Sequence, residues 1–257
     1  NLFFYISAAT KCHPNYVSFL MNKKTLSVKQ ITDILQSIDS DKKLMYDAKY
    51  AEKLYLDYQN ISCDDKKDLS DLKELLKNKS VLLIGPGNNI KKQKIKVKKF
   101  IEENNPIIIS VNYAPKDIKI DYVFLTKAKR YTQLLMDLKA SINNSAEIIA
   151  TSNVTKTAGN FKYVLNYGSL IDENTEIIDN SLIMLLKAML TVDVKKVYLA
   201  GFDGYSKRSD NYFNTSREYS FAKEKANYLN LYVKNFINEM VDKLQVNFIT
   251  SSHYKRV

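Results

Sequence analysis

The chain has 257 residues, enough to bury a sizeable core as one large domain or as two smaller ones. Hydrophobic residues make up 45% and charged residues 26% of it, as in soluble globular proteins, and no apolar run approaches the roughly 20 residues of a membrane-spanning helix. The formal net charge of +11 suggests an anionic partner, but only four of the 39 basic residues are arginines, which base readout favours. We therefore expect mainly solvated lysines and do not expect nucleic acid as a partner.

The chain begins with an apolar run at residues 2–6, preceded by Asn1 rather than by an initiator Met. No charged segment comes before this run, so it is not a signal peptide. Its aromatic side chains need a surface to pack on. We interpret the chain as a fragment with a further segment in front of Asn1.

Three short amphipathic helices are predicted in the next fifty residues. The first begins at His13-Pro14, because Pro is favoured at the first helical position, and His13 is expected to start this helix rather than to bind a metal. Ser27 and Gln30 form a capping-box pair before the second helix, and Asp47 caps the third. The side chains expected to face the core of this module are Tyr16, Val17, Leu20, Val28, Ile31, Ile34, Leu35, Ile38, Ala51, Leu54, Tyr55 and Tyr58.

A polar stretch without periodicity at residues 60–68 divides the chain. It predicts a helical module over residues 1–66 and a second domain over 67–257, which begins with a helix carrying Leu69, Leu72, Leu75 and Leu76. Strands are expected at 81–84, 107–111, 122–125, 147–150, 163–165, 196–200 and 246–249, with helices near 91–103, 128–142, 177–191 and 215–243. This alternation predicts an α/β fold, a Rossmann-like doubly wound mostly parallel sheet preceded by a small all-helical module.

A glycine turn follows the first expected strand. Residues 81–90 read Val-Leu-Leu-Ile-Gly-Pro-Gly-Asn-Asn-Ile, an apolar strand and a tight turn at the start of a Lys-rich helical pattern. Such a corner presents unpaired backbone N–H groups and the positive end of a helix dipole, which bind anions such as phosphate. Glycines also serve turn geometry alone, but we favour a phosphate site formed by Gly85, Gly87, Asn88 and Asn89.

The turn lacks the motifs of two common nucleotide-binding classes. Ile90 occupies the third glycine position of GxGxxG, and Asn112 stands at the second strand end, where a nicotinamide dehydrogenase has Asp or Glu. The Walker A motif is absent, which excludes a nucleotidase of that class. The Asn112 amide offers a donor and an acceptor, suited to a nucleobase edge or a sugar hydroxyl. The remaining polar strand ends are Thr126, Ser152-Asn153 and Gly201 to Tyr205.

Asp203 is the carboxylate best placed for chemistry, because it lies just beyond the end of the strand expected at 196–200. It suits a general base or a partner of sugar hydroxyls, and equally an Asp that makes a turn before Gly204. A polar loop follows, either a lid over bound phosphate or a plain surface loop, and its notable residues are Tyr205, Lys207, Arg208 and Tyr212.

Metal and disulfide chemistry have little support. Two separated histidines and two lone cysteines do not make a metal cluster, although a site made of carboxylates alone stays open. Cys12 and Cys63 form no CxxC pair, and a chain of this size needs no disulfide staples. We expect a reducing, cytoplasmic setting.

Three motifs of the helical module carry a resemblance to a known family. They are Cys-His-Pro-Asn-Tyr at 12–16, Asn-Lys-Lys-Thr-Leu-Ser-Val-Lys at 22–29 and Leu-Tyr-Leu-Asp-Tyr-Gln at 54–59. Residues 2–58 thereby resemble the segment that follows the barrel in aldolases of the HMGL-like, 4-hydroxy-2-oxovalerate aldolase type. In that family an N-terminal TIM barrel binds a divalent metal through Asp and an HxH pair, and this chain contains none of those motifs. The resemblance implies the post-barrel region of a lyase, with the protein's own upstream barrel as its partner.

Residues 81–205 carry a second resemblance, in Val81 to Lys91, Val111-Asn112, Asn180-Ser181 and Val197 to Tyr205. These segments are similar to the nucleotide-binding fold of bacterial sialyltransferases that use CMP-sialic acid. The resemblance implies a pyrimidine monophosphate or nucleotide-sugar ligand facing Gly87, Asn88, Asn112 and Ser181. The chain departs from that family at Leu182, where the family has Gly, and at Thr126-Lys127, which replaces Asn-Pro. It also has no His directly after the 201–214 loop, where the family keeps its catalytic base, and His253 lies much nearer the end of the sequence.

Three functional hypotheses follow. The leading one is the C-terminal region of an aldolase-like protein whose Rossmann-like domain binds a nucleotide or nucleotide-sugar. The second is a glycosyltransferase, with Asp203 as its catalytic candidate. The third is a non-catalytic docking module with a basic face. The ligand-binding residues expected under the first two are Gly85, Gly87, Asn88, Asn89, Asn112, Ser181, Asp203 and Tyr205.

Overall fold

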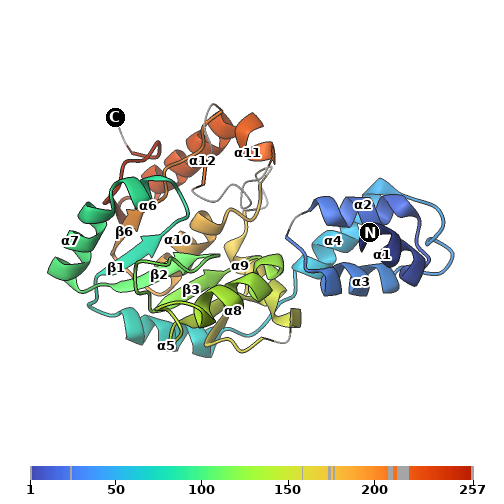
Figure 1. Cartoon of the computed structure of the whole chain (residues 1–257), viewed down its shortest axis with the longest axis horizontal. Helices are drawn as coiled ribbons and strands as arrows, with labels where there is room; N and C mark the ends of the chain where they lie inside the picture. Colours follow the sequence, from blue (N-terminus) through green and yellow to red (C-terminus); the bar gives the residue numbers. More distant parts are fainter. Residues whose placement is uncertain are drawn as a thin grey trace.

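The computed structural model describes residues 2–23, 25–157, 159–172, 175, 177–207, 211–212 and 220–255. The helices α1 (Leu2–Thr10), α2 (Pro14–Asn22), α3 (Val28–Gln36) and α4 (Ala48–Gln59) come first and pack around a hydrophobic core of their own. Figure 1 shows this bundle beside the larger part of the molecule, which contains the sheet. Within the described residues, no helix has both the length and the apolar character needed to cross a membrane.

The helix starts predicted in the bundle are confirmed by their capping contacts. The Nδ1 atom of His13 accepts a hydrogen bond from the Asn15 amide at 3.2 Å. Ser27 and Gln30 form the complete capping box, and Asp47 accepts from the first amides of α4. Two details differ from expectation. Residues 2–10 form a helix that was not predicted, and Val28 is 46% exposed rather than in the core, because it starts α3 at the edge of the bundle.

The sheet has the order β5-β4-β3-β2-β1-β6-β7, and every described pair of neighbouring strands is parallel. Val81 of β1, for example, pairs with Ile107 of β2 and with Val197 of β6. The α/β, Rossmann-like fold class is therefore confirmed. The strands are β1 (Val81–Ile84), β2 (Ile107–Val111), β3 (Tyr122–Leu125), β4 (Glu147–Thr151), β5 (Tyr163–Leu165), β6 (Lys196–Ala200) and β7 (Gln245–Phe248).

Helices cover both faces of the sheet, so the doubly wound arrangement is confirmed as well (Figure 1). One face packs on α5 (Lys66–Leu76), α10 (Ser181–Thr191) and α12 (Ala226–Glu239), and the other on α7 (Lys94–Asn104) and α8 (Tyr131–Lys139). Val81 and Leu83 face the first layer, whereas Leu82 and Ile84 face the second. Because both faces are buried, the strands are continuous apolar runs rather than alternating ones.

Several predicted helices are interrupted. A short α6 (Asn89–Lys92) precedes α7, the 3₁₀ helix η1 (Ala128–Arg130) precedes α8, and α11 (Ser220–Glu224) precedes α12. The 3₁₀ helix η2 (Ser152–Thr157) and α9 (Tyr167–Leu170) lie in segments that the periodicity left as connections.

The helical bundle joins the sheet through polar contacts near η2. The Gln30 side chain donates to the Asn153 carbonyl at 2.9 Å, and the Asn153 side chain donates to Gln59 Oε1 at 2.8 Å. The Lys129 amide donates to the Thr25 carbonyl at 3.2 Å. These contacts place the bundle against the segments that follow β3 and β4, close to the ends of those strands.

Candidate functional site

A cleft lies beyond the carboxyl ends of β1, β2 and β6. β1 pairs with β2 on one side and with β6 on the other, so the order of the sheet reverses here, which is where ligands bind in open parallel sheets. The cavity in this cleft has a volume of about 130 Å³. Its walls include Gly87, Asn112, Lys127, Arg130, Asp179, Ser181, Phe202, Asp203, Tyr205, Tyr212 and Tyr254. Of the eight predicted ligand-binding residues, the five among these are Gly87, Asn112, Ser181, Asp203 and Tyr205.

The backbone amides of the glycine turn already have protein partners. The Gly85 amide donates to the Ala200 carbonyl and the Gly87 amide to the Gly201 carbonyl, both at 2.8 Å. The Asn89 amide donates to Asp203 Oδ2, also at 2.8 Å, and the Asn88 amide faces the same carboxylate. The expectation that these amides are open to a ligand phosphate is therefore wrong in this structure, because a carboxylate of the chain itself occupies the corner.

Asp203 fits this corner because Gly87 has no side chain. A Cβ atom at residue 87 would lie 2.6 Å from Asp203 Cγ and 2.5 Å from the Gly201 carbonyl oxygen. Burial raises the pKa of the Asp203 carboxyl above its ordinary value, against the opposing effects of the Asn89 amide and Lys92. Oδ1 of Asp203 is buried and has no hydrogen-bond partner within the described residues. Asp203 thus both lines the cleft and closes the turn.

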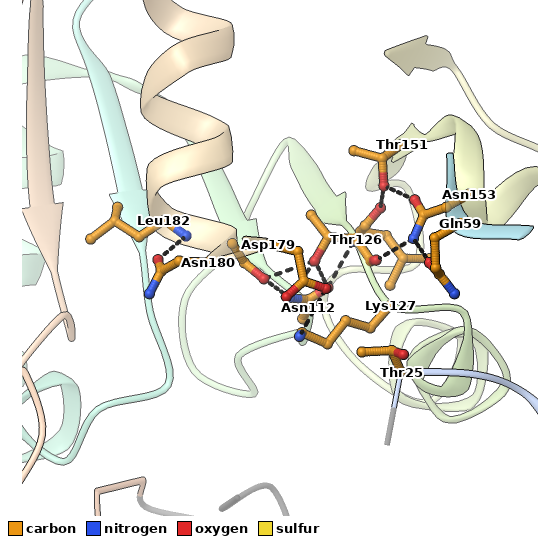
Figure 2. Close-up of polar contacts among 12 residues, drawn as sticks. Thr25, Gln59, Asn112, Thr126, Lys127, Thr151, Asn153, Asp179, Asn180 and Leu182 are labelled. Atoms are coloured by element: carbon orange, nitrogen blue, oxygen red, sulfur yellow. Dashed lines mark hydrogen bonds and ion pairs between the residues drawn. The ribbon is translucent and has the colours of Figure 1, made fainter. Parts of the chain in front are cut away.

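Asn112, Thr126 and Ser181 meet at the opposite wall, after the ends of β2 and β3 and at the start of α10. Figure 2 shows Asn112 and Thr126 of this group. The Thr126 amide donates to Asn112 Oδ1 at 2.9 Å, and Asn112 Nδ2 donates to Ser181 Oγ at 3.0 Å. The Thr126 and Ser181 hydroxyls lie 2.8 Å apart. The structure thus brings together two predicted residues, Asn112 and Ser181, but it uses the Asn112 amide to hold three segments in register.

An ion pair that sequence reasoning missed lies beside this cluster. Lys127 Nζ is 3.9 Å from Asp179 Oδ2, and the two side chains are only 14% and 16% exposed. Tyr55 of α4 lies within electrostatic reach of both, and burial, aided by Asp179, raises the pKa of its phenol. The position of Lys127, directly after the third strand, was the available signal. No sequence signal indicated Asp179, because its segment precedes a helix rather than following a strand.

Aromatic side chains form the β6 side of the cleft. Tyr205 and Tyr212 lie with their hydroxyl groups 3.5 Å apart, and Tyr212 bridges to the backbone of Gly87. The polar loop therefore sends both of its tyrosines into the cleft wall, whereas Lys207 is exposed. Arg208, named with them in the sequence, lies outside the described residues.

Among the described residues, no three His, Cys, Asp or Glu side chains are placed together to hold a metal ion. Comparison of the chain with protein-family models, with curated proteins and with solved structures finds no match. The two family resemblances and the roles they imply therefore stay predictions.

Proposed function

We propose that this chain binds a nucleotide or nucleotide-sugar in the cleft beyond β1, β2 and β6. The observation that carries the proposal is the pairing of two unlike walls at the point where the strand order reverses. One wall has the aromatic rings of Phe202, Tyr205 and Tyr212, and the other has the cations Lys127 and Arg130. Aromatic faces stack on bases, and cations compensate phosphate charge.

The phosphate position in this proposal differs from the one that the sequence favoured. The amides of the glycine turn face Asp203, and the Asn180 side chain caps α10 by accepting from the Leu182 and Ile183 amides at 3.1 and 3.3 Å. Backbone donors near the cleft are therefore largely used within the protein. Side-chain cations, above all Arg130, take over the role of binding the phosphate.

The test is titration of the chain with cytidine 5′-monophosphate by calorimetry. Replacing Arg130 by Gln is expected to weaken binding about tenfold, because a hydrogen bond to a charged group contributes roughly 1.5–3 kcal/mol and 1.4 kcal/mol is a factor of ten. Lys129→Gln is the matched control, since it removes a neighbouring exposed charge that does not line the cleft. Equal affinities of the wild type and the Arg130 variant, or no binding by the wild type, would contradict the proposal.

We further propose that the chain serves as the post-barrel region of an aldolase-like protein. The motifs at 12–16, 22–29 and 54–59 support this idea. Under it, the aldol chemistry belongs to the upstream barrel, and the cleft described here is a separate binding site.

A second candidate function is glycosyl transfer from a nucleotide-sugar, favoured by the position of Asp203 on the cleft wall and by its raised pKa. Turnover of CMP-N-acetylneuraminic acid by the isolated chain is expected to fall about a hundredfold in Asp203→Asn. Asn keeps an acceptor for the Asn89 amide, so cytidine monophosphate affinity is expected to stay unchanged. Absence of turnover by the wild type would exclude transfer and leave the binding proposal intact.

A further inference from the structure

A second cavity, of about 310 Å³, lies on the other side of the segment formed by Asp203 and Gly204. It brings together segments that are distant in sequence, the α6 turn, the residues after β6 and the residues after β7. Every side chain on its walls is polar, and the lining residues other than Gly204 are Asn88, Asn89, Lys92, Asp203, Ser206, Asn211, Ser251, Ser252 and His253. A lining without aromatic or aliphatic side chains offers a nucleobase nothing to stack on, but it suits a ligand rich in hydroxyl or charged groups.

The walls of this cavity are held by hydrogen bonds between the segments. Gln93 Nε2 donates to Ser251 Oγ at 3.0 Å, and Asn89 Nδ2 donates to the Ser251 carbonyl at 3.0 Å. The His253 amide donates to the Asp203 carbonyl at 2.8 Å. The segment after β7 is thus fixed against both α6 and the end of β6, so the cavity is formed without a ligand.

Two cavity-wall groups interact with the Asp203 carboxylate by charge alone. Within the described residues, Lys92 Nζ and the His253 imidazole have neither a hydrogen bond nor an ion-pair partner. Burial raises the pKa of the Asp203 carboxyl, and both groups lie near enough to oppose that rise. A cation and an imidazole that make no hydrogen bond, together with neighbouring hydroxyl groups, form a set of donors suited to an anionic group on a hydroxylated molecule.

We propose that this cavity is a second binding site, for a sugar phosphate. Lys92 and His253 contact the phosphate group, and the hydroxyls of Ser206 and Ser251 contact the sugar hydroxyls. This site is separate from the nucleotide cleft and shares with it only the wall at Asp203, Gly204 and Asn211.

The experiment is calorimetric titration of the full chain, without nucleotide, with glucose 6-phosphate, glucose and inorganic phosphate as probes. Glucose 6-phosphate is expected to bind more tightly than either of the other two. Lys92→Gln is expected to weaken the binding of glucose 6-phosphate about tenfold, and His253→Gln is expected to weaken it as well. Lys96→Gln is the matched control, because Lys96 is also an exposed lysine, lies four positions along the chain in α7 and does not line the cavity.

Three results would overturn the proposal. The first is that the wild type does not bind glucose 6-phosphate at about 10 mM. The second is that the Lys92 and Lys96 variants lose the same affinity for glucose 6-phosphate. The third is that the wild type binds glucose 6-phosphate and inorganic phosphate equally well. Far-UV circular dichroism checks folding, and the His253 variant decides the matter if the Lys92 variant does not fold. Arg130→Gln is expected to leave these affinities unchanged, so failure here is distinguishable from failure of nucleotide binding.

Discussion

Replacing Gly201 by alanine is expected to lower the free energy of unfolding by about 4 kcal/mol or more. Gly201 directly follows β6 and has a φ of +70°, in the left-handed region that disfavours residues with a side chain. A Cβ atom there would overlap the Gly85 carbonyl oxygen and lie 3.0 Å from Ile90 Cβ. Since the overlapping atom belongs to the backbone of β1's turn, the variant separates the two strand ends that border the cleft.

Urea denaturation followed by circular dichroism measures this effect. Gly168→Ala is the matched control, because Gly168 lies in α9 and the one close contact of a Cβ atom there, at 2.5 Å, is with the Asn60 side-chain oxygen, which can move. The control is expected to change the free energy of unfolding by less than about 1 kcal/mol. If both variants lose the same stability, the close approach of the β1 and β6 turns is not what requires glycine at position 201.

Replacing Asn153 by alanine is expected to cost about 3 kcal/mol of stability. The Asn153 side chain is 2% exposed, and its Nδ2 donates to Gln59 Oε1 at 2.8 Å and to the Thr126 carbonyl at 3.0 Å. Its Oδ1 accepts from the Thr151 hydroxyl, so one amide joins α4 to the ends of β3 and β4 (Figure 2). Alanine would leave buried polar groups without partners, each at a cost of roughly 1–3 kcal/mol.

Denaturant titration again measures the effect, with Asn144→Ala as the control because Asn144 is exposed. The Asn153 variant is also expected to weaken nucleotide binding, since the Thr126 backbone that it supports leads to Asn112 and Lys127. If Asn153→Ala loses no more stability than Asn144→Ala, water replaces the Asn153 amide, and that amide does not hold α4 against the ends of β3 and β4.

The strands were predictable because both faces of the sheet are buried. Each strand is a short run of apolar residues that polar turns bound, and this local signal places β1 and β6 at the predicted residues. The helix starts at His13, Ser27 and Asp47 were equally local, since capping acts over three residues. The breaks between α6 and α7 and between η1 and α8 escaped prediction, because the apolar period continues through them.

The site was predictable only as far as strand ends indicate it. Asn112 could be named because it directly follows a strand, whereas Ser181 was named only from the resemblance to sialyltransferases. The ion pair of Lys127 and Asp179 could not be named, because its partners are 52 positions apart and meet only where the segment after β3 contacts the start of α10.

The sequence by itself determined the strands, the capped helix starts and the parallel α/β class, because hydrophobic periodicity and capping depend on neighbours a few residues apart. Only the tertiary structure decided what fills the glycine corner. Amides that are unpaired in an isolated turn donate to whichever anion the fold places beside them, and here that anion is Asp203, 114 positions along the chain from Asn89. The hydrogen-bond donors that remain for a ligand are therefore set by how the strand ends come together, and no single segment determines them.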